Sequence, residues 1–213
     1  MEQVFFGGRH ELLHDTNTEY NTLVGGIYFD TSEISHSCVV SSDGKIKNLR
    51  VKLTGSPGIG KEYVFTLMVN GAPSALTLTI SDTETSDADT THEVDVSAGD
   101  TVSLECNPDG TPTVRYATWT SMFEGDTAKE SLVLGKGRPE INEATTYIPL
   151  GVFDSFSTAT AVQVPCPTSG KLKNFYVSLS AAPGDGKSWI FTLLVNEVES
   201  TLIVTITGAN TTG

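Results

Sequence analysis

Residues 10–14, His-Glu-Leu-Leu-His, have the spacing of a zinc protease helix. In such a helix two histidines one turn apart hold Zn²⁺, and the glutamate between them activates a metal-bound water. The surrounding chain does not complete the pattern: no third ligand follows His14 at the metzincin spacing, and Glu19 lies too close to come from a second helix. A zinc metallohydrolase acting through His10 and His14 therefore remains a remote alternative, and we expect a surface loop or a single helical turn.

A glycine-rich segment, GSPGIGK at residues 55–61, matches the first part of a phosphate-binding loop. Glu62 stands where such a loop has Ser or Thr, and its carboxylate would repel phosphate. The segment also runs into the strand pattern EYVFTLMVN, whereas a phosphate-binding loop must open a helix whose N-terminal amides face the phosphate. The spacing therefore predicts a glycine-rich turn that joins two strands.

The acidic segment 81–95 carries four carboxylates close together, those of Asp82, Glu84, Asp87 and Asp89. Ca²⁺ prefers such oxygen ligands, but the segment lacks the glycine and the closing glutamate of an EF-hand loop. Acidic, threonine-rich segments of this kind are typical of solvated loops between strands, and we expect one here.

Three aromatic side chains could stack on a sugar ring: Tyr116, Trp119 and Trp189. They lie inside alternating strand patterns, which favour the core over a ligand-binding face. No catalytic, cofactor-binding or metal-binding residue is assigned from any of these patterns, and the protein is not expected to be an enzyme.

Composition narrows the choice of partner. The net charge is −13, from 26 acidic and 13 basic residues, and the basic residues are scattered, so nucleic acid and anionic membranes are both unfavourable partners. No apolar run approaches the roughly 18 residues of a membrane span, and the N-terminus lacks the basic and apolar regions of a signal peptide. The cysteines, Cys38, Cys106 and Cys166, lack CxxC spacing and predict buried or half-buried thiols in a reducing cytoplasm.

The chain contains an internal repeat. Residues 44–70, GKIKNLRVKLTGSPGIGKEYVFTLMVN, align without a gap to residues 170–196, GKLKNFYVSLSAAPGDGKSWIFTLLVN, at an offset of 126 residues (170 minus 44). The match continues upstream with small gaps, since residues 19–30 resemble residues 145–154. A period of this length exceeds that of a solenoid unit and indicates a duplicated domain.

Each repeat has the pattern of β structure throughout. In residues 46–53 a local slip in the alternation turns Ile46, Leu49, Val51 and Leu53 toward one face. Segments rich in Gly, Pro, Asn and Asp separate about eight such strands in the first repeat. The fold class is therefore all-β, with two tandem jelly-roll-like β-sandwich repeats.

The two repeats are expected to form domains of unequal completeness. Residues 1–130 hold the first sandwich with its N-terminal arm and linker, and residues 131–213 hold a second sandwich that lacks its last strands. A sandwich without those strands leaves open sheet edges and an uncovered apolar face. Either the chain is a fragment of a longer protein, the interpretation we favour, or a neighbouring molecule supplies the strands.

The pattern GKLKN-x-YVSLS-x-APG-x-GK-x-x-x-FTL-x-VN, with a glycine-rich entry before it and SAGDTVSLE after it, resembles a β-sandwich repeat of uncharacterised virion-associated proteins of tailed phages and related viruses. The resemblance covers most of both repeats apart from the termini and the linker EGDTAKE. It implies a fold more than a function, because such sandwiches decorate heads, build tails and also occur on bacterial surfaces. No catalytic residues or cofactors belong to it.

The function expected from these observations is that of a non-enzymatic structural virion component, a capsid decoration, tail or fibre protein that is made in the host cytoplasm. Its partners would be copies of itself, in a homo-oligomer, and other virion structural proteins. The alternative from a different class is a secreted or surface-displayed glycan-binding module.

Overall fold

A computed structural model describes residues 2–8, 11–26, 28–136, 145–151, 158–166 and 168–213. The chain divides into two compact units, unit 1 over residues 1–132 and unit 2 over residues 133–213. The structure is nearly all β, as predicted. Among the described residues no helix has the length and apolar character that a membrane span requires.

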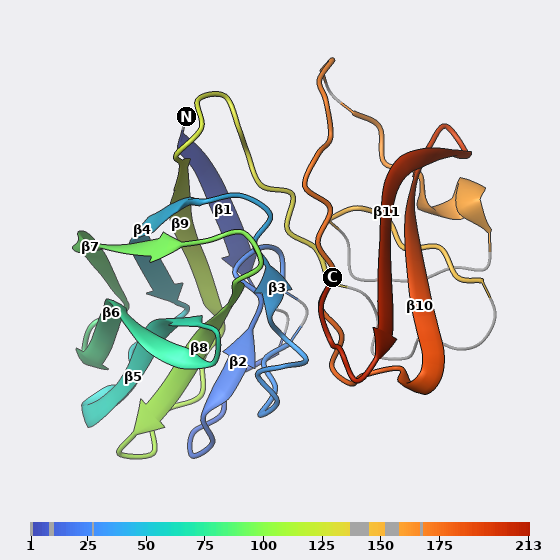
Figure 1. The fold of residues 1–213 in the computed structure, drawn as a ribbon. Helices are drawn as coiled ribbons and strands as arrows, with labels where there is room; N and C mark the ends of the chain where they lie inside the picture. Colours follow the sequence, from blue (N-terminus) through green and yellow to red (C-terminus); the bar gives the residue numbers. More distant parts are fainter. Residues whose placement is uncertain (1, 9–10, 27, 137–144, 152–157, 167) are drawn as a thin grey trace. The chain divides into compact units, whose positions relative to one another are not determined.

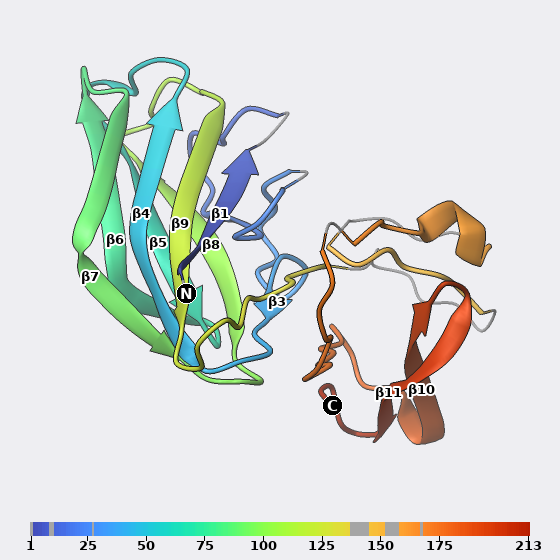
Figure 2. The same ribbon diagram turned by 90° about the horizontal axis from the view of Figure 1, so that it is seen from above.

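Unit 1 is a sandwich of two antiparallel sheets (Figures 1 and 2). The first sheet has the order β1-β9-β4-β7, with strands Glu2–Gly8, Ala117–Gly125, Gly44–Leu53 and Ser86–Val96. The second has the order β2-β8-β5-β6, with strands Glu19–Asn21, Thr101–Asp109, Gly58–Val69 and Ala72–Asp82. The short strand β3, Cys38–Val39, also pairs with β8.

The pairing of unit 1 is nested along the chain. β1 pairs with β9, β2 with β8, β4 with β7, and β5 with β6, all antiparallel. Such nesting is what results when one long hairpin is rolled up, and it gives a jelly roll of eight strands with β3 as an addition. The predicted jelly-roll-like sandwich is therefore present in unit 1.

The core of unit 1 lies between the two sheets. Its largest fully buried side chains include Trp119, Tyr63, Phe5, Phe65 and Phe123. The slip predicted in the alternation of residues 46–53 is a β-bulge at Asn48, whose φ is 56°. It turns Ile46, Leu49, Val51 and Leu53 into the core, where each is at most 2% exposed.

The β5–β6 hairpin is held by a two-residue turn at Asn70 and Gly71, whose φ angles are 52° and 75°. Positive φ at both central residues is the signature of a type I′ turn, whose twist matches that of the strands it joins. Asn tolerates this conformation and Gly adopts it without steric cost, so the hairpin is encoded locally.

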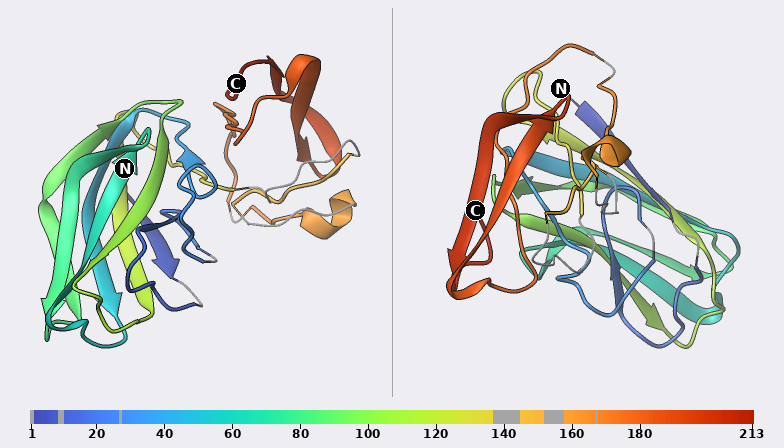
Figure 3. Two further views of the ribbon diagram at one scale, coloured as in Figure 1. Left: turned by 90° about the horizontal axis from the view of Figure 1, so that it is seen from below. Right: turned by 90° about the vertical axis from the view of Figure 1, so that its right-hand side faces the viewer.

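Unit 2 repeats that hairpin and little else of the sandwich. β10, Gly184–Val195, and β11, Val198–Gly208, begin and end 126 residues after β5 and β6. Their two register shifts fall at the same positions, and the turn residues Asn196 and Glu197 have φ of 52° and 67°. Figure 3 shows β10 and β11 as a twisted two-stranded ribbon.

The other strands that the repeat predicts for unit 2 are not formed among its described residues, and for these the expectation of β structure throughout is wrong. Residues 170–179 stand where β4 stands in unit 1, yet only Ser178 makes a bridge, with Thr212. Residues Ala159–Val162 of unit 2 form one turn of 3₁₀ helix. In unit 1 the counterparts of the unformed strands are β1 to β4, whose partner strands are β7, β8 and β9. Residues 133–213 contain no repeat of β7, β8 or β9.

Candidate functional site

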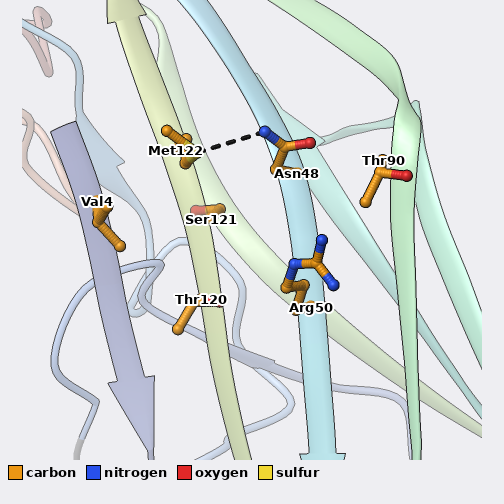
Figure 4. Close-up of a pocket in the computed structure, with 7 residues that line it drawn as sticks. All are labelled: Val4, Asn48, Arg50, Thr90, Thr120, Ser121 and Met122. Carbon is orange, nitrogen blue, oxygen red and sulfur yellow. Dashed lines mark hydrogen bonds between the residues drawn. The ribbon is translucent and has the colours of Figure 1, made fainter. Parts of the chain in front are cut away.

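The outer face of the first sheet of unit 1 carries a shallow hollow (Figure 4). All four strands of the sheet contribute side chains to its lining: Val4, Asn48, Arg50, Thr90, Thr120, Ser121 and Met122. The Asn48 amide donates a hydrogen bond to Met122 Sδ at 3.3 Å, which fixes one wall of the hollow. The lining offers one guanidinium, hydroxyl groups and an amide, which suit a neutral polar or anionic ligand.

Two irregularities of the sheet shape this hollow. Lys47 pairs with Glu93 and Leu49 with Asp89, so residues 90–92 of β7 bulge out opposite Asn48. Asp89 holds the bulge, because its Oδ1 accepts the N–H groups of Thr91 and His92, each at 3.1 Å. The sequence showed the slip in β4 but gave no sign of the matching bulge in β7.

Asp89 is 7% exposed and its carboxylate is well satisfied. Its Oδ2 lies 2.8 Å from His92 Nδ1 and accepts the N–H of Thr77, on the edge strand of the other sheet, at 3.2 Å. Burial alone would raise the pKa of Asp89, but the hydrogen bonds from Thr91, His92 and Thr77 outweigh burial and hold it well below its usual range. A carboxylate committed to structure in this way is a poor candidate for catalysis.

Charged side chains cross the same sheet beside the hollow. Lys47 Nζ lies 2.5 Å from Glu124 Oε2 and 3.0 Å from Glu2 Oε1, and Lys45 Nζ lies 3.3 Å from Glu93 Oε2. The hydrogen bonds to Glu124 and Glu2 raise the pKa of the Lys47 ammonium. Each ammonium forms ion pairs with carboxylates on neighbouring strands and so links the strands of the sheet. Arg50 is the cationic side chain in the lining of the hollow.

The zinc-protease spacing does not build a metal site in the part of the chain that the structure describes. His10 lies outside the described residues. Residues 11–14 are not helical: Glu11 lies in a bend, and residues 12–14 have no regular secondary structure. His14 Nδ1 accepts the N–H groups of Thr16 and Asn17, both at 3.1 Å, so the ring closes a local turn. Leu13, which precedes His14, is buried and anchors the segment to unit 1.

The glycine-rich segment is a connection between strands, as predicted. Residues 54–57 join β4 to β5, and the rest of the segment is the irregular start of β5, where Gly58 and Gly60 have φ of 110° and 70°. The N–H of Gly60 donates to Asp82 Oδ1 at 2.7 Å, so a carboxylate of the protein takes an amide that a phosphate-binding loop would offer to phosphate. Gly184 and Gly186 repeat these φ values, 94° and 69°, in unit 2.

The acidic segment is mostly a strand, and the prediction of a loop is wrong for residues 86–95. They belong to β7, and only residues 83–85 connect it to β6. Asp87 Oδ2 accepts the N–H of Thr79 at 3.3 Å, as Asp89 does for Thr77. These carboxylates cover the outward N–H groups of edge strand β6, which protects that edge from pairing with other chains.

The aromatic side chains do not form a common platform. Trp119 is 2% exposed, as expected of a core residue. Its ring packs edge-to-face against Phe29, with centroids 5.5 Å apart, and its indole N–H donates to the Leu23 carbonyl at 3.1 Å. Trp189 belongs to unit 2, where it packs half-buried against Leu179, Val204 and Ile206. Tyr116 is exposed.

The three cysteines differ in burial. Cys38 and Cys106 are buried thiols, as predicted, whereas Cys166 is exposed, contrary to prediction. Among the described residues no three His, Cys, Asp or Glu side chains come together in a way that could hold a metal ion. No protein-family model matches the chain, and a search of curated proteins finds no match to it.

Proposed function

We propose that this chain is a non-enzymatic structural component of a virion, a capsid decoration, tail or fibre protein that assembles through contacts between β-sandwich units. The observation that carries the proposal is the rolled-hairpin topology of unit 1, together with the repetition of its β5–β6 hairpin in unit 2. Jelly rolls build viral capsids, and they also form lectins and cupins. The step from this fold to a virion is therefore an argument by analogy.

Strand β1 supplies a surface on which such contacts can form. It is the outermost strand of its sheet, and two apolar side chains stand on its solvent face, Val4 at 46% and Phe6 at 67% exposure. An edge strand with exposed apolar side chains is a favourable place for another molecule to pack. Phe5, between them, points into the core, so the outer residues can be changed without opening the sandwich.

The test is the assembly state of the full chain, followed by light scattering over a range of concentrations and by electron microscopy. We expect ordered oligomers or filaments, and we expect Phe6→Ser to weaken them without lowering the unfolding temperature. Ile59→Ser is the matched control, because Ile59 is 75% exposed on the other sheet. A chain that stays monomeric at every concentration would overturn the proposal, and so would equal effects of the two substitutions.

A glycan-binding module is the second candidate, favoured by the hollow in Figure 4. Arg50, Asn48 and Thr120 present donors and acceptors of the kind that hold sugar hydroxyls, although the buried Trp119 cannot stack on a ring. A glycan array read at millimolar sugar, with Arg50→Ala as the comparison, decides the matter. Binding that Arg50→Ala abolishes would favour this function, and an array without binding would remove it.

A further inference from the structure

The outer face of the first sheet of unit 1 is divided by charge. The pairing of its strands places the outward positions in four rows that run across β7, β4, β9 and β1. In that strand order the first two rows are Asp95, Lys45, Glu124, Glu2 and Glu93, Lys47, Met122, Val4, and the other two are Ala88, Arg50, Thr120, Phe6 and Ser86, Lys52, Thr118, Gly8. The first half of the face therefore has two ammoniums among four carboxylates, whereas the second half has two cations and no carboxylate.

Arg50 and Lys52 are the cations of the second half. Both side chains are exposed, and neither forms an ion pair among the described residues. Lys45 and Lys47, on the same strand, pair instead with carboxylates of the neighbouring strands. The charges of Arg50 and Lys52 are thus left for a ligand, while those of the two lysines are used within the sheet.

Carboxylates on the neighbouring strands do not neutralise the second half. Asp87 and Asp89 turn to the other sheet, where they accept N–H groups of β6 at 3.3 and 3.2 Å. Glu124 lies four residues from Thr120 on β9, and four residues of a strand span about 14 Å, which exceeds the screening length of about 8 Å at physiological ionic strength. A small anion beside Arg50 therefore meets positive charge, although the chain as a whole has a net charge of −13.

The internal repeat also separates the two pairs of cations. The residues 126 positions after Lys45, Lys47, Arg50 and Lys52 are Lys171, Lys173, Tyr176 and Ser178. The two lysines that form ion pairs recur in the second copy, whereas the two cations without a carboxylate neighbour are replaced by neutral residues. The sequence pattern shared by the copies therefore requires no cation at either place, which points to a role for Arg50 and Lys52 that unit 1 has alone.

The hollow lies between the rows of Lys47 and Arg50, and its walls are neutral and polar apart from Arg50 (Figure 4). Thr90, Thr120 and Asn48 contribute hydroxyl and carboxamide groups to its lining, and such groups both donate and accept hydrogen bonds, as sugar hydroxyls do. Its volume of about 290 Å³ is at the lower end for a ligand site, which suits one or two sugar rings.

A polypeptide or a long polyanion fits this face less well. β4 is paired with β7 on one side and with β9 on the other, so its backbone groups cannot receive a further strand. The positions beside Arg50 and Lys52 on these two strands carry hydroxyl groups and one alanine, and they offer no apolar pocket for a side-chain anchor. A long polyanion would extend over the four carboxylates of the first half, which repel it.

We infer that Arg50, Lys52 and the hollow form a binding site for a short glycan that carries a carboxylate, such as one with a uronic acid residue. The guanidinium and the ammonium hold the carboxylate, and the polar groups of the hollow bond to the sugar hydroxyls. This inference deepens the second candidate function, the binding of a glycan, and rests on that function and not on the virion assignment.

The experiment follows the isotope-labelled full chain by NMR while a disaccharide of glucuronic acid and glucose, cellobiouronate, is added. The comparison ligand is cellobiose, which differs only in having a hydroxymethyl group in place of the carboxylate. We expect the amides of Arg50, Lys52 and Thr120 to shift, with a dissociation constant in the millimolar range for cellobiouronate and an affinity at least about tenfold lower for cellobiose. Raising NaCl from about 50 to about 500 mM should weaken the binding of cellobiouronate at least about threefold.

Substitutions on β4 give an independent test. Arg50→Gln should lower the affinity for cellobiouronate at least about tenfold, and Lys52→Gln at least about threefold, because each removes a charge that faces the carboxylate. Lys45→Gln is the matched control, since it removes a cation from the same face of the same strand but from the half with carboxylates, and it should change the affinity by less than about twofold. Unchanged amide shifts outside the substituted rows show that each variant is folded.

Each other outcome overturns the proposal. Equal affinities for cellobiose and cellobiouronate would refute the requirement for a carboxylate and leave glycan binding in place. Absence of shifts with both disaccharides, together with a glycan array without binding, would remove the site and the glycan function together. Shifts with polyglutamate alone would assign the face to an acidic polypeptide, and an equal loss of affinity in Lys45→Gln would mean that the charge of the whole sheet, and not this site, attracts the ligand.

Discussion

Substitution of alanine for Gly44 and for Gly170 compares one position of the repeat in two surroundings. A Cβ at Gly44 would lie 2.7 Å from two ring carbons of Phe123 and still closer to the backbone carbonyl of Glu124. Phe123 is fully buried, and the carbonyl belongs to β9, which pairs with β4 in this region, so neither can move without disturbing the sheet. At Gly170 nothing lies within 4 Å of the added carbon.

Overpacking of a core by one methyl group against groups that cannot yield costs about 3 kcal/mol. For a unit of this size that corresponds to a fall in unfolding temperature of about 10 °C. Neither glycine has a positive φ, so alanine brings no backbone strain at either position. Gly170→Ala should therefore change the free energy of unfolding by less than about 0.5 kcal/mol.

Tryptophan fluorescence assigns each effect to its unit, because Trp119 lies in unit 1 and Trp189 in unit 2. Urea unfolding of Gly44→Ala in a Trp189→Phe background reports unit 1 alone, and Gly170→Ala in a Trp119→Phe background reports unit 2. Equal costs at the two positions, or a cost below about 0.5 kcal/mol at Gly44, would refute the reasoning from close packing against β9.

Three further substitutions test individual features. Tyr63→Phe should raise the free energy of unfolding by about 1 kcal/mol, because the fully buried hydroxyl has no hydrogen-bond partner among the described atoms; a loss of stability in urea unfolding would show that the hydroxyl is bonded. Asp89→Asn should cost about 2 kcal/mol at pH 7. The pKa of Asp89 is lowered on folding, so its contribution is complete above the unfolded pKa near 4 and is lost as pH falls toward the folded pKa; a gap between variant and parent that stayed constant from pH 7 to pH 2.5 would contradict this. Glu197→Gly should stabilise the β10–β11 hairpin by about 1 kcal/mol, since φ is 67° at Glu197 and the equivalent residue of unit 1 is Gly71; an unchanged rate of hydrogen exchange in β10 would count against a strained turn.

Features of the fold that depend on neighbouring residues could be predicted from the sequence. The alternation of residues 46–53 identified the buried face of β4, and the slip in it corresponds to the bulge at Asn48. The Asn70-Gly71 turn lies in one of the segments rich in Gly, Pro, Asn and Asp that were predicted to separate strands, and the glycine-rich segment was recognised as a connection because a strand pattern follows it. Each of these depends on side-chain period or on backbone conformations that particular residues favour.

Features that depend on distant partners could not be predicted in this way. Residues 81–95, which include most of β7, were predicted to be a loop because they are acidic and rich in threonine. In the structure their carboxylates accept hydrogen bonds from β6, an edge strand of the other sheet. The hollow on the outer face was missed for the same reason, since it needs one residue or more from each of four strands. No local pattern shows which strands lie together, because the nested pairing brings the first strand of unit 1 against the last.

Residues 44–53 and 170–179 separate the two kinds of information within one chain. Their patterns are nearly the same, yet the first segment is a ten-residue strand, whereas in the second only Ser178 makes a bridge. β4 has β7 on one side and β9 on the other, and the sequence contains no second copy of either for unit 2. The hairpin forms in both repeats, as β5–β6 in unit 1 and as β10–β11 in unit 2, because only two residues separate its two strands. Strand propensity in this protein thus acts only where a partner is present, since nearly the same pattern forms a strand between β7 and β9 in unit 1 and a single bridge in residues 170–179.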